Sequence, residues 1–411
     1  MSHSLRQYMM VTLSYWGFTL TDGALRMLVV LYFHQLGYSP FEVAALFLFY
    51  EFFGMVTNLF GGWLAARTGL NTTLHIGLAL QMLALGMLLV DTVWLSVFYV
   101  MAAQALSGIA KDLNKMSAKS SIKLLLPENA QGKLYHWVAL LTGSKNTLKG
   151  VGFFIGALLL SSIGFRAAIL VLFCGLMVVC IVSFLLLDRD MGKSQYQPKF
   201  RELLSKSPAI NRLSAARFFL FGSRDIWFVV ALPVYLQSVL GWSYTAVGSL
   251  LALWIIAYGA VQSIAPKLTQ RGQSKSPDGK TALHWVLPLC LIPAAIAAAL
   301  HYTLAEPATV LMIGLAIYGI IFAINSSLHS YLIVAYAQRD GVSVDVGFYY
   351  MANAAGRLTG SLLSGLIYQW QGLEACMLAS SVFIAVACTL STGLAKYQTQ
   401  SLELESTATP G

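Results

Sequence analysis

The stretch LLTGSKNTLKGVGFFIGALLL (residues 140–160) has the composition of a membrane-spanning helix, yet it contains Lys145 and Lys149 one helical turn apart. A lysine at the centre of a bilayer costs about 2.5–3.5 kcal/mol on insertion scales. With Gly152 and Gly156 the two lysines follow a +4, +3, +4 spacing, which keeps all four positions on one helix face. The same spacing returns later in the chain with Asn353, Arg357, Gly360 and Ser364. These two stripes predict a membrane protein built from two related halves.

The composition supports this prediction. Of the 411 residues, 57% are hydrophobic and 10% are charged, and the mean hydropathy is +0.70, which is too apolar for a soluble globular protein of this length. Spanning a bilayer takes about 20 apolar residues. Runs of that order occur at 9–34, 41–64, 73–90, 93–113, 134–160 and 166–187, and again at 213–238, 245–266, 283–303, 308–335, 345–368 and 374–394.

We therefore predict an all-α integral membrane protein with twelve transmembrane helices in two pseudo-symmetric six-helix bundles. The expected domains are an N-terminal bundle over 1–187, a central cytoplasmic loop over 188–212, a C-terminal bundle over 213–395 and a cytoplasmic tail over 396–411. Matching halves of this kind favour an alternating-access carrier that binds its substrate between them.

The loop charges predict the orientation. Lys and Arg gather in the loops on one side of the predicted membrane, and the opposite loops contain none apart from Arg166. By the positive-inside rule, the basic side is cytoplasmic. We expect a multi-pass protein of the bacterial inner membrane with both termini in the cytoplasm. This bias accounts for most of the net charge of +9, so no nucleic-acid partner is expected.

Charged residues at membrane depth are the candidate functional groups, because such residues mark substrate or ion pathways. They are Asp22, Arg26, Glu51, Lys145, Lys149, Arg224, Asp225 and Arg357. Five of these are basic and three are acidic, so the surplus predicts a small anionic substrate. The five cations are the candidate binding residues, together with Asn146 and Asn353. Asn325, Tyr258 and Tyr349 are possible polar helpers, and the three acids are candidates for proton coupling.

Several alternatives stay open. Asp22 and Arg26 are i,i+4 and either neutralise each other or line the cavity. Glu51 is either a packing partner of a basic residue or a proton carrier. Arg224 and Asp225 are adjacent, so we expect their side chains to diverge, with Arg224 pointing into the cavity.

A ladder of lysines recurs every four residues at Lys111, Lys115, Lys119 and Lys123. It is either a cytoplasmic helix extension that obeys the positive-inside rule or an electrostatic funnel for anions. Lys111 and Lys115 are the members placed deep enough to contact substrate.

Two G-x-x-x-G pairs, Gly152/Gly156 and Gly356/Gly360, predict close helix packing. The five cysteines are scattered through apolar runs and the seven histidines are spread singly, so we expect no metal, no cofactor and no enzyme activity.

The sequence GWLAARTGLN (62–71) resembles the connector motif G-x-L-a-D-R-x-G-R-K of the major facilitator superfamily, with Ala66 in place of the aspartate. Longer stretches resemble organoarsenical efflux permeases of the ArsJ type. They are YWGFTLTDGALRMLVVLYFHQLGYSPFE (15–42), FLFYEFFGMVTNLFGGWLAARTGLN (47–71), QALSGIAKDLNKMSAKSSIKLL (104–125), GSKNTLKGVGFFIGA (143–157) and NAAGRLTGSLLSG (353–365).

This resemblance implies an efflux transporter of 1-arseno-3-phosphoglycerate that confers arsenate resistance. It also implies a functional pairing, without physical contact, with a glyceraldehyde-3-phosphate dehydrogenase that makes the substrate. We expect a monomer in the lipid bilayer. The competing hypotheses are transport or exchange of ordinary organophosphates or phosphate, export of cationic drugs, which would need surplus acid at depth, and a non-transporting sensor.

Overall fold

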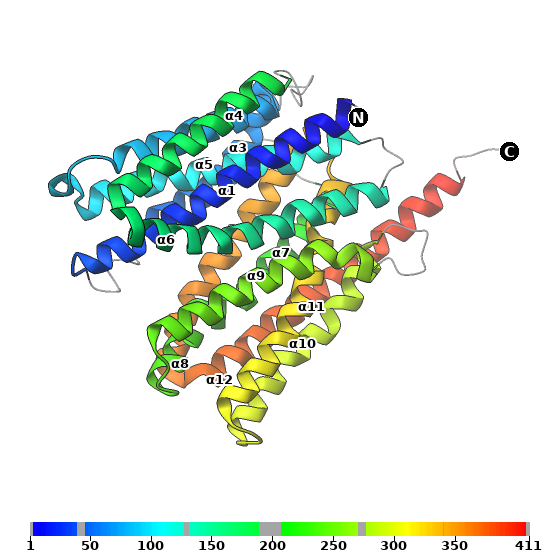
Figure 1. The fold of residues 1–411 in the computed structure, drawn as a ribbon. Coiled ribbons are helices and arrows are strands. Elements are labelled where there is room, and N and C mark those ends of the chain that lie inside the picture. The colour runs from blue at the N-terminus through cyan, green and yellow to red at the C-terminus, as the bar shows by residue number, and fades with distance from the viewer. Residues whose placement is uncertain are drawn as a thin grey trace. The chain divides into compact units, whose positions relative to one another are not determined.

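The computed structural model describes residues 3–38, 46–126, 131–188, 207–269, 277–339 and 341–407. Helices dominate these residues, and no strand occurs among them. Figure 1 shows the helices in chain order. They are α1 (His3–Gln35), α3 (Leu48–Thr68), α4 (Leu70–Met87), the short 3₁₀ helix η1 (Thr92–Trp94), α5 (Val97–Leu125), α6 (Gln131–Leu186), α7 (Pro208–Phe228), α8 (Ala231–Ser238), α9 (Tyr244–Thr269), α10 (Gly279–His301), α11 (Pro307–Tyr336) and α12 (Val342–Thr407).

Single glycines divide the two longest helices. Gly164 in α6 has φ 79° and ψ 172°, and Gly372 in α12 has φ 77° and ψ −168°. Side chains with a Cβ rarely adopt such angles, so each glycine ends one span and begins the next. With α6 and α12 divided there, and with Pro208–Ser238 taken as one span, the described residues contain twelve long helical segments, as predicted.

The surface has the polarity expected of a protein in lipid. Large apolar side chains such as Leu158, Leu185 and Leu291 are exposed, whereas Asp22 and Asp225 are buried. Within the described residues, seven helical stretches are long and apolar enough to cross a membrane. They are Leu70–Met87, Gly132–Leu186, Pro208–Ser238, Ala246–Thr269, Gly279–His301, Pro307–Tyr336 and Val342–Leu394. Helices α1, α3 and α5 are not among these stretches, and they carry many of the charges discussed below.

The chain divides into two compact units. Unit 1 contains Met1–Trp137, Ser144–Ser205 and Ala337–Met351, and unit 2 contains Val138–Gly143, Lys206–Tyr336 and Ala352–Gly411. The units exchange two short segments relative to the predicted halves. Most of the predicted central loop, residues 189–206, and the end of the predicted tail, 408–411, lie outside the described residues, so the predicted domain boundaries stay a prediction.

Within unit 1, α5 packs against α1, α3 and α4, and α4 and α5 lie side by side in Figure 1. The Ser96 side chain caps the start of α5 by accepting a hydrogen bond from the Tyr99 amide at 3.4 Å, which satisfies one of the amides that a helix start leaves without a partner. The Ser117 hydroxyl donates to the Leu70 carbonyl at 2.5 Å, so α5 is also held to the start of α4.

Within unit 2, α11 packs against α10, α9 and α7. The core of unit 2 includes several aromatic side chains. The rings of Trp227 and Tyr318 meet edge to face with centroids 5.2 Å apart, a favoured arrangement for two aromatic groups. A capping box formed by Asp278 and Thr281 begins α10, with the Thr281 amide donating to the Asp278 carboxylate at 2.8 Å.

Candidate functional site

Four helices of unit 1 bring a group of charged side chains together inside the bundle. Asp22 of α1 accepts hydrogen bonds from the Tyr50 hydroxyl of α3 at 2.8 and 3.0 Å. The Lys149 ammonium of α6 lies 4.0 Å from the same carboxylate. Arg26 forms its ion pair with Glu51 at 3.6 Å instead. Mutual neutralisation of Asp22 and Arg26 is therefore the wrong alternative, because each residue pairs with a different helix.

The first two lysines of the ladder belong to this group. The Lys111 ammonium lies 3.8 Å from Glu51 and 3.6 Å from the buried Asp112, and it lies 4.0 Å from the centroid of the Tyr50 ring. Lys115 forms a close ion pair with Asp112. Both Arg26 and Lys111 contact the Glu51 carboxylate, which is the contact that the packing interpretation predicts.

Lys145 differs from its neighbours. It lies within electrostatic range of Lys149, Lys115, Lys111 and Asp112, and it is half-buried. In the described parts of the chain it forms no ion pair and no hydrogen bond. Asn146 follows it on α6 and is also half-buried.

The charges in this unit 1 cluster do not balance. The cluster consists of Arg26, Lys111, Lys115, Lys145, Lys149, Asp22, Glu51 and Asp112. Among the residues that the structure describes, five cations therefore face three carboxylates. Removing charges from water is expensive unless they are paired, so the two surplus positive charges favour the binding of an anion.

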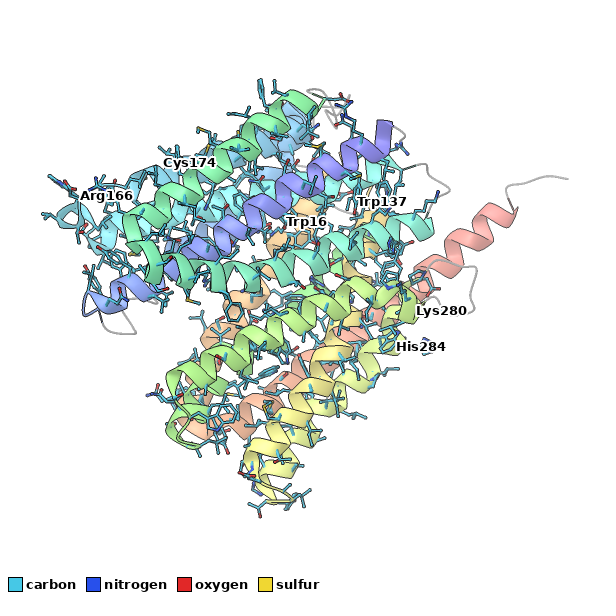
Figure 2. The ribbon with its side chains drawn as sticks, in the orientation of Figure 1. Trp16, Trp137, Arg166, Cys174, Lys280 and His284 are labelled. Atoms are coloured by element: carbon cyan, nitrogen blue, oxygen red, sulfur yellow. The ribbon has the colours of Figure 1, made fainter. Side chains whose placement is uncertain are left out.

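Close approach of α1 and α6 places Lys149 opposite Asp22. A Cβ on Gly152 would lie 2.7 Å from the Leu20 carbonyl oxygen, and one on Gly156 would lie 3.0 Å from the Ala24 Cα. The Trp16 indole also donates to the Ser144 hydroxyl at 2.8 Å, one residue before Lys145. Figure 2 labels Trp16 on α1 beside α6.

Farther along the same pair of helices, the rings of Tyr8 and Trp137 stack with centroids 3.9 Å apart. Figure 2 labels Trp137 near the N-terminal end of α6, and it labels Arg166 at the opposite end of unit 1. The Tyr8–Trp137 stack, the hydrogen bond from Trp16 and the close approach at the two glycines thus keep α1 and α6 in contact along much of their length.

Unit 2 has a second charged group on α7 and α12. The Asp225 carboxylate is fully buried and accepts from Arg224 Nε at 2.7 Å and from Arg357 Nε at 3.0 Å. The expectation that Arg224 and Asp225 diverge is wrong, because the long guanidinium side chain folds back onto its neighbour's carboxylate. Two cations thus share one acid in this Asp225 cluster.

The glycines of α12 permit this arrangement. A Cβ on Gly356 would lie 2.8 Å from the Phe218 Cα, and one on Gly360 would lie 3.1 Å from the Asp225 Cβ. The α12 backbone therefore lies directly against α7 at the level of Asp225, which brings Arg357 within reach of the carboxylate.

Arg217 of α7 is a buried cation that sequence reasoning missed. Its Nε donates to the Asn353 side-chain oxygen at 2.9 Å, and its Nη1 donates to the Ser326 carbonyl and hydroxyl at 3.2 and 3.1 Å. The Tyr258 hydroxyl donates to the same Ser326 hydroxyl oxygen at 2.9 Å. Arg217 lies seven residues before Arg224, so the two share a face of α7, and that spacing was the available signal.

The polar helpers fall in different places. Asn353 and Tyr258 belong to the Arg217 network, whereas Asn325 donates to the Ala282 carbonyl at 2.9 Å and holds α11 against α10. Tyr349 is fully buried and belongs to unit 1.

Two charged residues of the ladder region are buried. Asp112, which is not among the predicted site residues, is 2% exposed. Lys119 is likewise 2% exposed. The ladder continues the helix through Leu125, and Lys119 is buried there rather than exposed to solvent.

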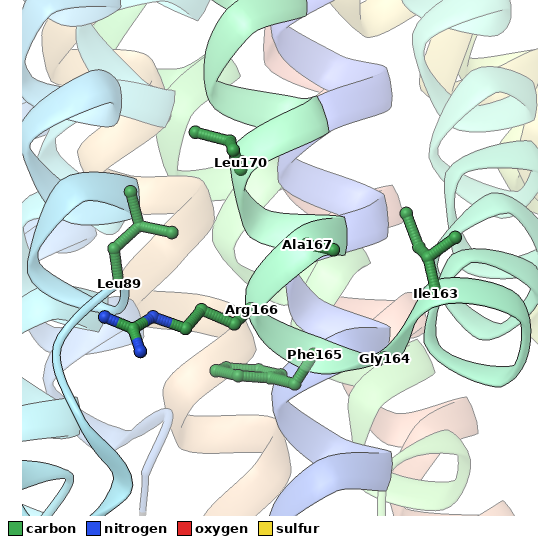
Figure 3. A pocket seen from close by; sticks show the side chains of 7 residues that line it. All are labelled: Leu89, Ile163, Gly164, Phe165, Arg166, Ala167 and Leu170. Atoms are coloured by element: carbon green, nitrogen blue, oxygen red, sulfur yellow. The ribbon is translucent and has the colours of Figure 1, made fainter.

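A cavity of about 660 Å³ lies away from these groups, where the chain turns at Gly164. Figure 3 shows its mostly apolar lining, which consists of Leu89, Ile163, Gly164, Phe165, Arg166, Ala167 and Leu170. Arg166 is exposed there and pairs with Asp91 at 3.0 Å. The lining includes none of the candidate site residues. Among the described residues, no group of three His, Cys, Asp or Glu side chains is placed to hold a metal ion.

Comparison with solved structures shows a common transporter fold. The chain is similar to the human organic anion transporter MFSD10 (TETRAN), with a TM-score of 0.74 and 15% identity, covering 95% of this chain and 100% of that one. It is similar to a bacterial homologue of the iron transporter ferroportin in an outward-facing state, with a TM-score of 0.75 and 14% identity, covering 96% and 100%. The fucose:proton symporter FucP of E. coli gives 0.71 and 12%, covering 95% and 99%.

Sequence comparison adds one curated relative and a family. The quinolone resistance protein NorB of Staphylococcus aureus (strain MRSA252) is 26% identical over 197 residues, which is 48% of this chain. The match thus spans 41% of the length of that relative. Residues 10–277, well over half of the chain, match the family description Major Facilitator Superfamily. The chain belongs to the Major Facilitator Superfamily, and its family and fold both point to a membrane transporter rather than an enzyme.

Proposed function

We propose that the protein exports an anionic organoarsenical, 1-arseno-3-phosphoglycerate, by alternating access and thereby confers arsenate resistance. The observation that supports an anionic substrate is Lys145, a cation at membrane depth that has no ion pair in the described residues. The surplus charge of the unit 1 cluster and the two arginines around Asp225 support the same substrate class. The arsenical itself rests on the resemblance to ArsJ-type permeases.

The chemistry of the cations suits this substrate. The molecule has a phosphate at one end and an arsenate at the other. Guanidinium groups bind such oxyanions with paired hydrogen bonds, while lysine supplies a movable point charge. Lys145 and Lys149 in unit 1 and Arg224 and Arg357 in unit 2 are the proposed binding residues, with Arg26, Lys111, Lys115, Asn146 and Asn353 beside them in their own clusters.

The comparisons support transport of some solute and do not identify the substrate. The solved structures share under 25% identity with this chain, so they show the fold alone. The name of NorB says that it confers drug resistance, which agrees with an efflux direction here. Export of cationic drugs would favour surplus acid, and the unit 1 cluster has the reverse.

The deciding experiment measures arsenate tolerance of a sensitive bacterial strain that expresses the protein with and without a glyceraldehyde-3-phosphate dehydrogenase. We expect tolerance only when both are present. Lys149→Ala and Arg357→Ala should abolish it at normal membrane levels of protein. Resistance that does not depend on the dehydrogenase would refute the arseno-ester, and wild-type tolerance in both variants would refute the binding residues. Quinolone tolerance is the specificity control and should stay unchanged.

The second candidate is transport or exchange of ordinary organophosphates or phosphate, because the same surplus cations accept them. It predicts uptake of labelled glycerol phosphate that excess inorganic phosphate inhibits. Absence of such uptake, with arsenate tolerance present, separates the two candidates.

Energy coupling is assigned to the acids at membrane depth. Asp22, Glu51 and Asp225 are the proposed coupling residues if the carrier exchanges its substrate for protons. Replacing each by its amide while measuring efflux with and without an imposed pH gradient tests this role: proton antiport is supported if a variant loses its response to the gradient.

A further inference from the structure

A segment late in the sequence packs against early helices inside unit 1. This segment, Ala337–Met351, is assigned to unit 1 together with α3 and α5 and is called the latch segment below; residue 340 lies outside the described residues. The Ser343 hydroxyl donates to the Gly62 carbonyl of α3 at 2.8 Å. A Cβ on Gly347 would lie 2.6 Å from the Asn58 carbonyl oxygen. The two backbones are therefore in direct contact.

The last two lysines of the ladder hold the same segment. The Lys119 ammonium donates to the Tyr350 hydroxyl, and the Lys123 ammonium donates to the Ala337 carbonyl. Lysine is almost never fully buried unless it is paired, yet Lys119 is 2% exposed. Its burial is explained by Tyr350, whose ring centroid also lies 4.8 Å from the ammonium.

Tyr350 contacts a second lysine, one turn back along α5. The Lys115 ammonium lies 4.5 Å from the centroid of the Tyr350 ring. Lys115 is also the ion-pair partner of Asp112, which in turn contacts Lys111. The Tyr350 side chain thus contacts Lys115, which belongs to the unit 1 cluster, and also Lys119, which holds the latch segment.

We propose that Tyr350 is a positioning residue that fastens the latch segment to α5 through Lys119 and couples this latch, through Lys115, to the occupancy of the unit 1 cluster. An anion that draws the Lys115 ammonium toward itself removes a cation from the ring face, and a cation held over an aromatic face is attracted to it. Anion binding therefore weakens the hold of α5 on Tyr350. The coupling to anion rests on the proposed function, whereas the latch itself does not.

The polar contacts between the latch segment and α5 are suited to an interface that opens. Hydrogen bonds from ammonium groups to a phenol and to a carbonyl can be exchanged for bonds to water, whereas a buried apolar joint has no such replacement. An apolar contact lies beside these hydrogen bonds: Ala66 of α3 packs against Val344, with Leu59 and Trp63 next to them.

The latch is tested by thiol labelling in a variant whose five native cysteines are replaced. Ser343→Cys and Ala66→Cys serve as reporters on opposite sides of the contact, and both positions are buried. We expect Lys119→Met and Tyr350→Phe to speed labelling of both reporters by N-ethylmaleimide about fivefold or more. Tyr350→Phe removes the hydroxyl while it keeps the ring, so it isolates the hydrogen bond from the cation–ring contact.

Two controls make the result specific. Lys133→Met removes an exposed lysine and should leave the labelling rates unchanged. Ser391→Cys reports on a buried position of unit 2, so faster labelling there as well would mean general loosening and would overturn the latch. Unchanged labelling of both reporters in Lys119→Met and Tyr350→Phe would overturn it too.

The coupling is tested with 3-phosphoglycerate and inorganic phosphate as probes. We expect each probe that raises the melting temperature to speed labelling of Ser343→Cys about twofold or more, and to lose this effect in Tyr350→Leu. A probe that stabilises the protein without changing the labelling overturns the coupling. Probes that do not bind at all instead contradict the proposed anion function, and the latch is still decided by the Lys119 and Tyr350 variants.

Discussion

At the scale of single residues, replacing Lys145 gives the most direct test of the proposed binding site. Replacing it by methionine removes a charge that makes no ion pair in the described residues, so we expect the melting temperature in detergent to stay equal or rise. Transport should weaken, because a hydrogen bond to a charged group contributes about 1.5–3 kcal/mol, or roughly a 10- to 100-fold change in affinity. The measurement is the apparent KM for substrate, together with a thermal unfolding curve.

Two further variants serve as controls for this prediction. Lys145→Arg keeps the charge and should retain part of the transport. Lys133→Met lowers the overall charge equally from an exposed position and should transport normally. If Lys145→Met unfolds at a much lower temperature while it still transports, the residue has a structural role and is not a binding residue.

For Asp225 we expect the opposite effect on the melting temperature, because its carboxylate pairs with two arginines. Asp225→Asn leaves both guanidinium groups without their buried partner, and breaking a buried pair in this way costs about 3–5 kcal/mol. We expect a lower melting temperature, partly restored in the double variant Asp225→Asn/Arg357→Gln, which keeps a single arginine. A double variant that is less stable than Asp225→Asn would show that the charge pairing is not what stabilises this site.

At the scale of helices, glycines decide which backbones touch. Gly156→Ala and Gly360→Ala insert a methyl group against a neighbouring helix, and overpacking of this kind costs about 1–3 kcal/mol. Gly175 and Gly365 lie on the same two helices with no atom within 4 Å of an added Cβ, so their alanine variants should be neutral or gain up to about 1 kcal/mol. Melting temperatures of the four variants give the comparison, and equal losses in all four would contradict it.

Helix periodicity explains how much of the site could be predicted. The +4, +3, +4 stripes placed Lys149 and Arg357 on inward-facing positions, because a helix face follows directly from spacing. Pairing between helices does not follow from spacing, so the Arg26–Glu51 and Asp225–Arg357 pairs had to come from the structure. Asp112 was missed because a buried helix and a solvated extension have the same charge pattern.

The latch segment shows the same limit for whole elements. Hydropathy predicts the span that begins α12, but nothing in the local sequence says that Ser343 and Tyr350 pack against α3 and α5. Ala66 stands where the superfamily motif has an aspartate, and sequence reasoning registered only that departure. The sequence shows the lysines that hold the segment as a ladder, but it does not show which residues they contact.

At the scale of the whole molecule, the predicted orientation is testable with the residues described. Val93 in η1 and Leu304 between α10 and α11 are exposed, and the loop charges assign both connections to the outside. Lys133 is assigned to the cytoplasm. We expect Val93→Cys and Leu304→Cys, in the cysteine-replaced protein, to react with a membrane-impermeant maleimide on intact cells. Lys133→Cys should react only after permeabilisation. The reverse pattern would invert the orientation and with it the proposed export direction.

The proposed substrate also predicts how the carrier responds to the membrane potential. Export of an anion from a negative-inside cell is favoured by about 2.3 kcal/mol per charge per 100 mV. In cells that make the substrate, we therefore expect efflux of arsenic to fall when valinomycin and potassium collapse the potential. Collapsing the pH gradient alone distinguishes uniport, which is unaffected, from proton antiport through Asp22, Glu51 or Asp225. Efflux that is independent of the potential would mean that no net charge crosses the membrane, and the surplus cations would then need a different explanation.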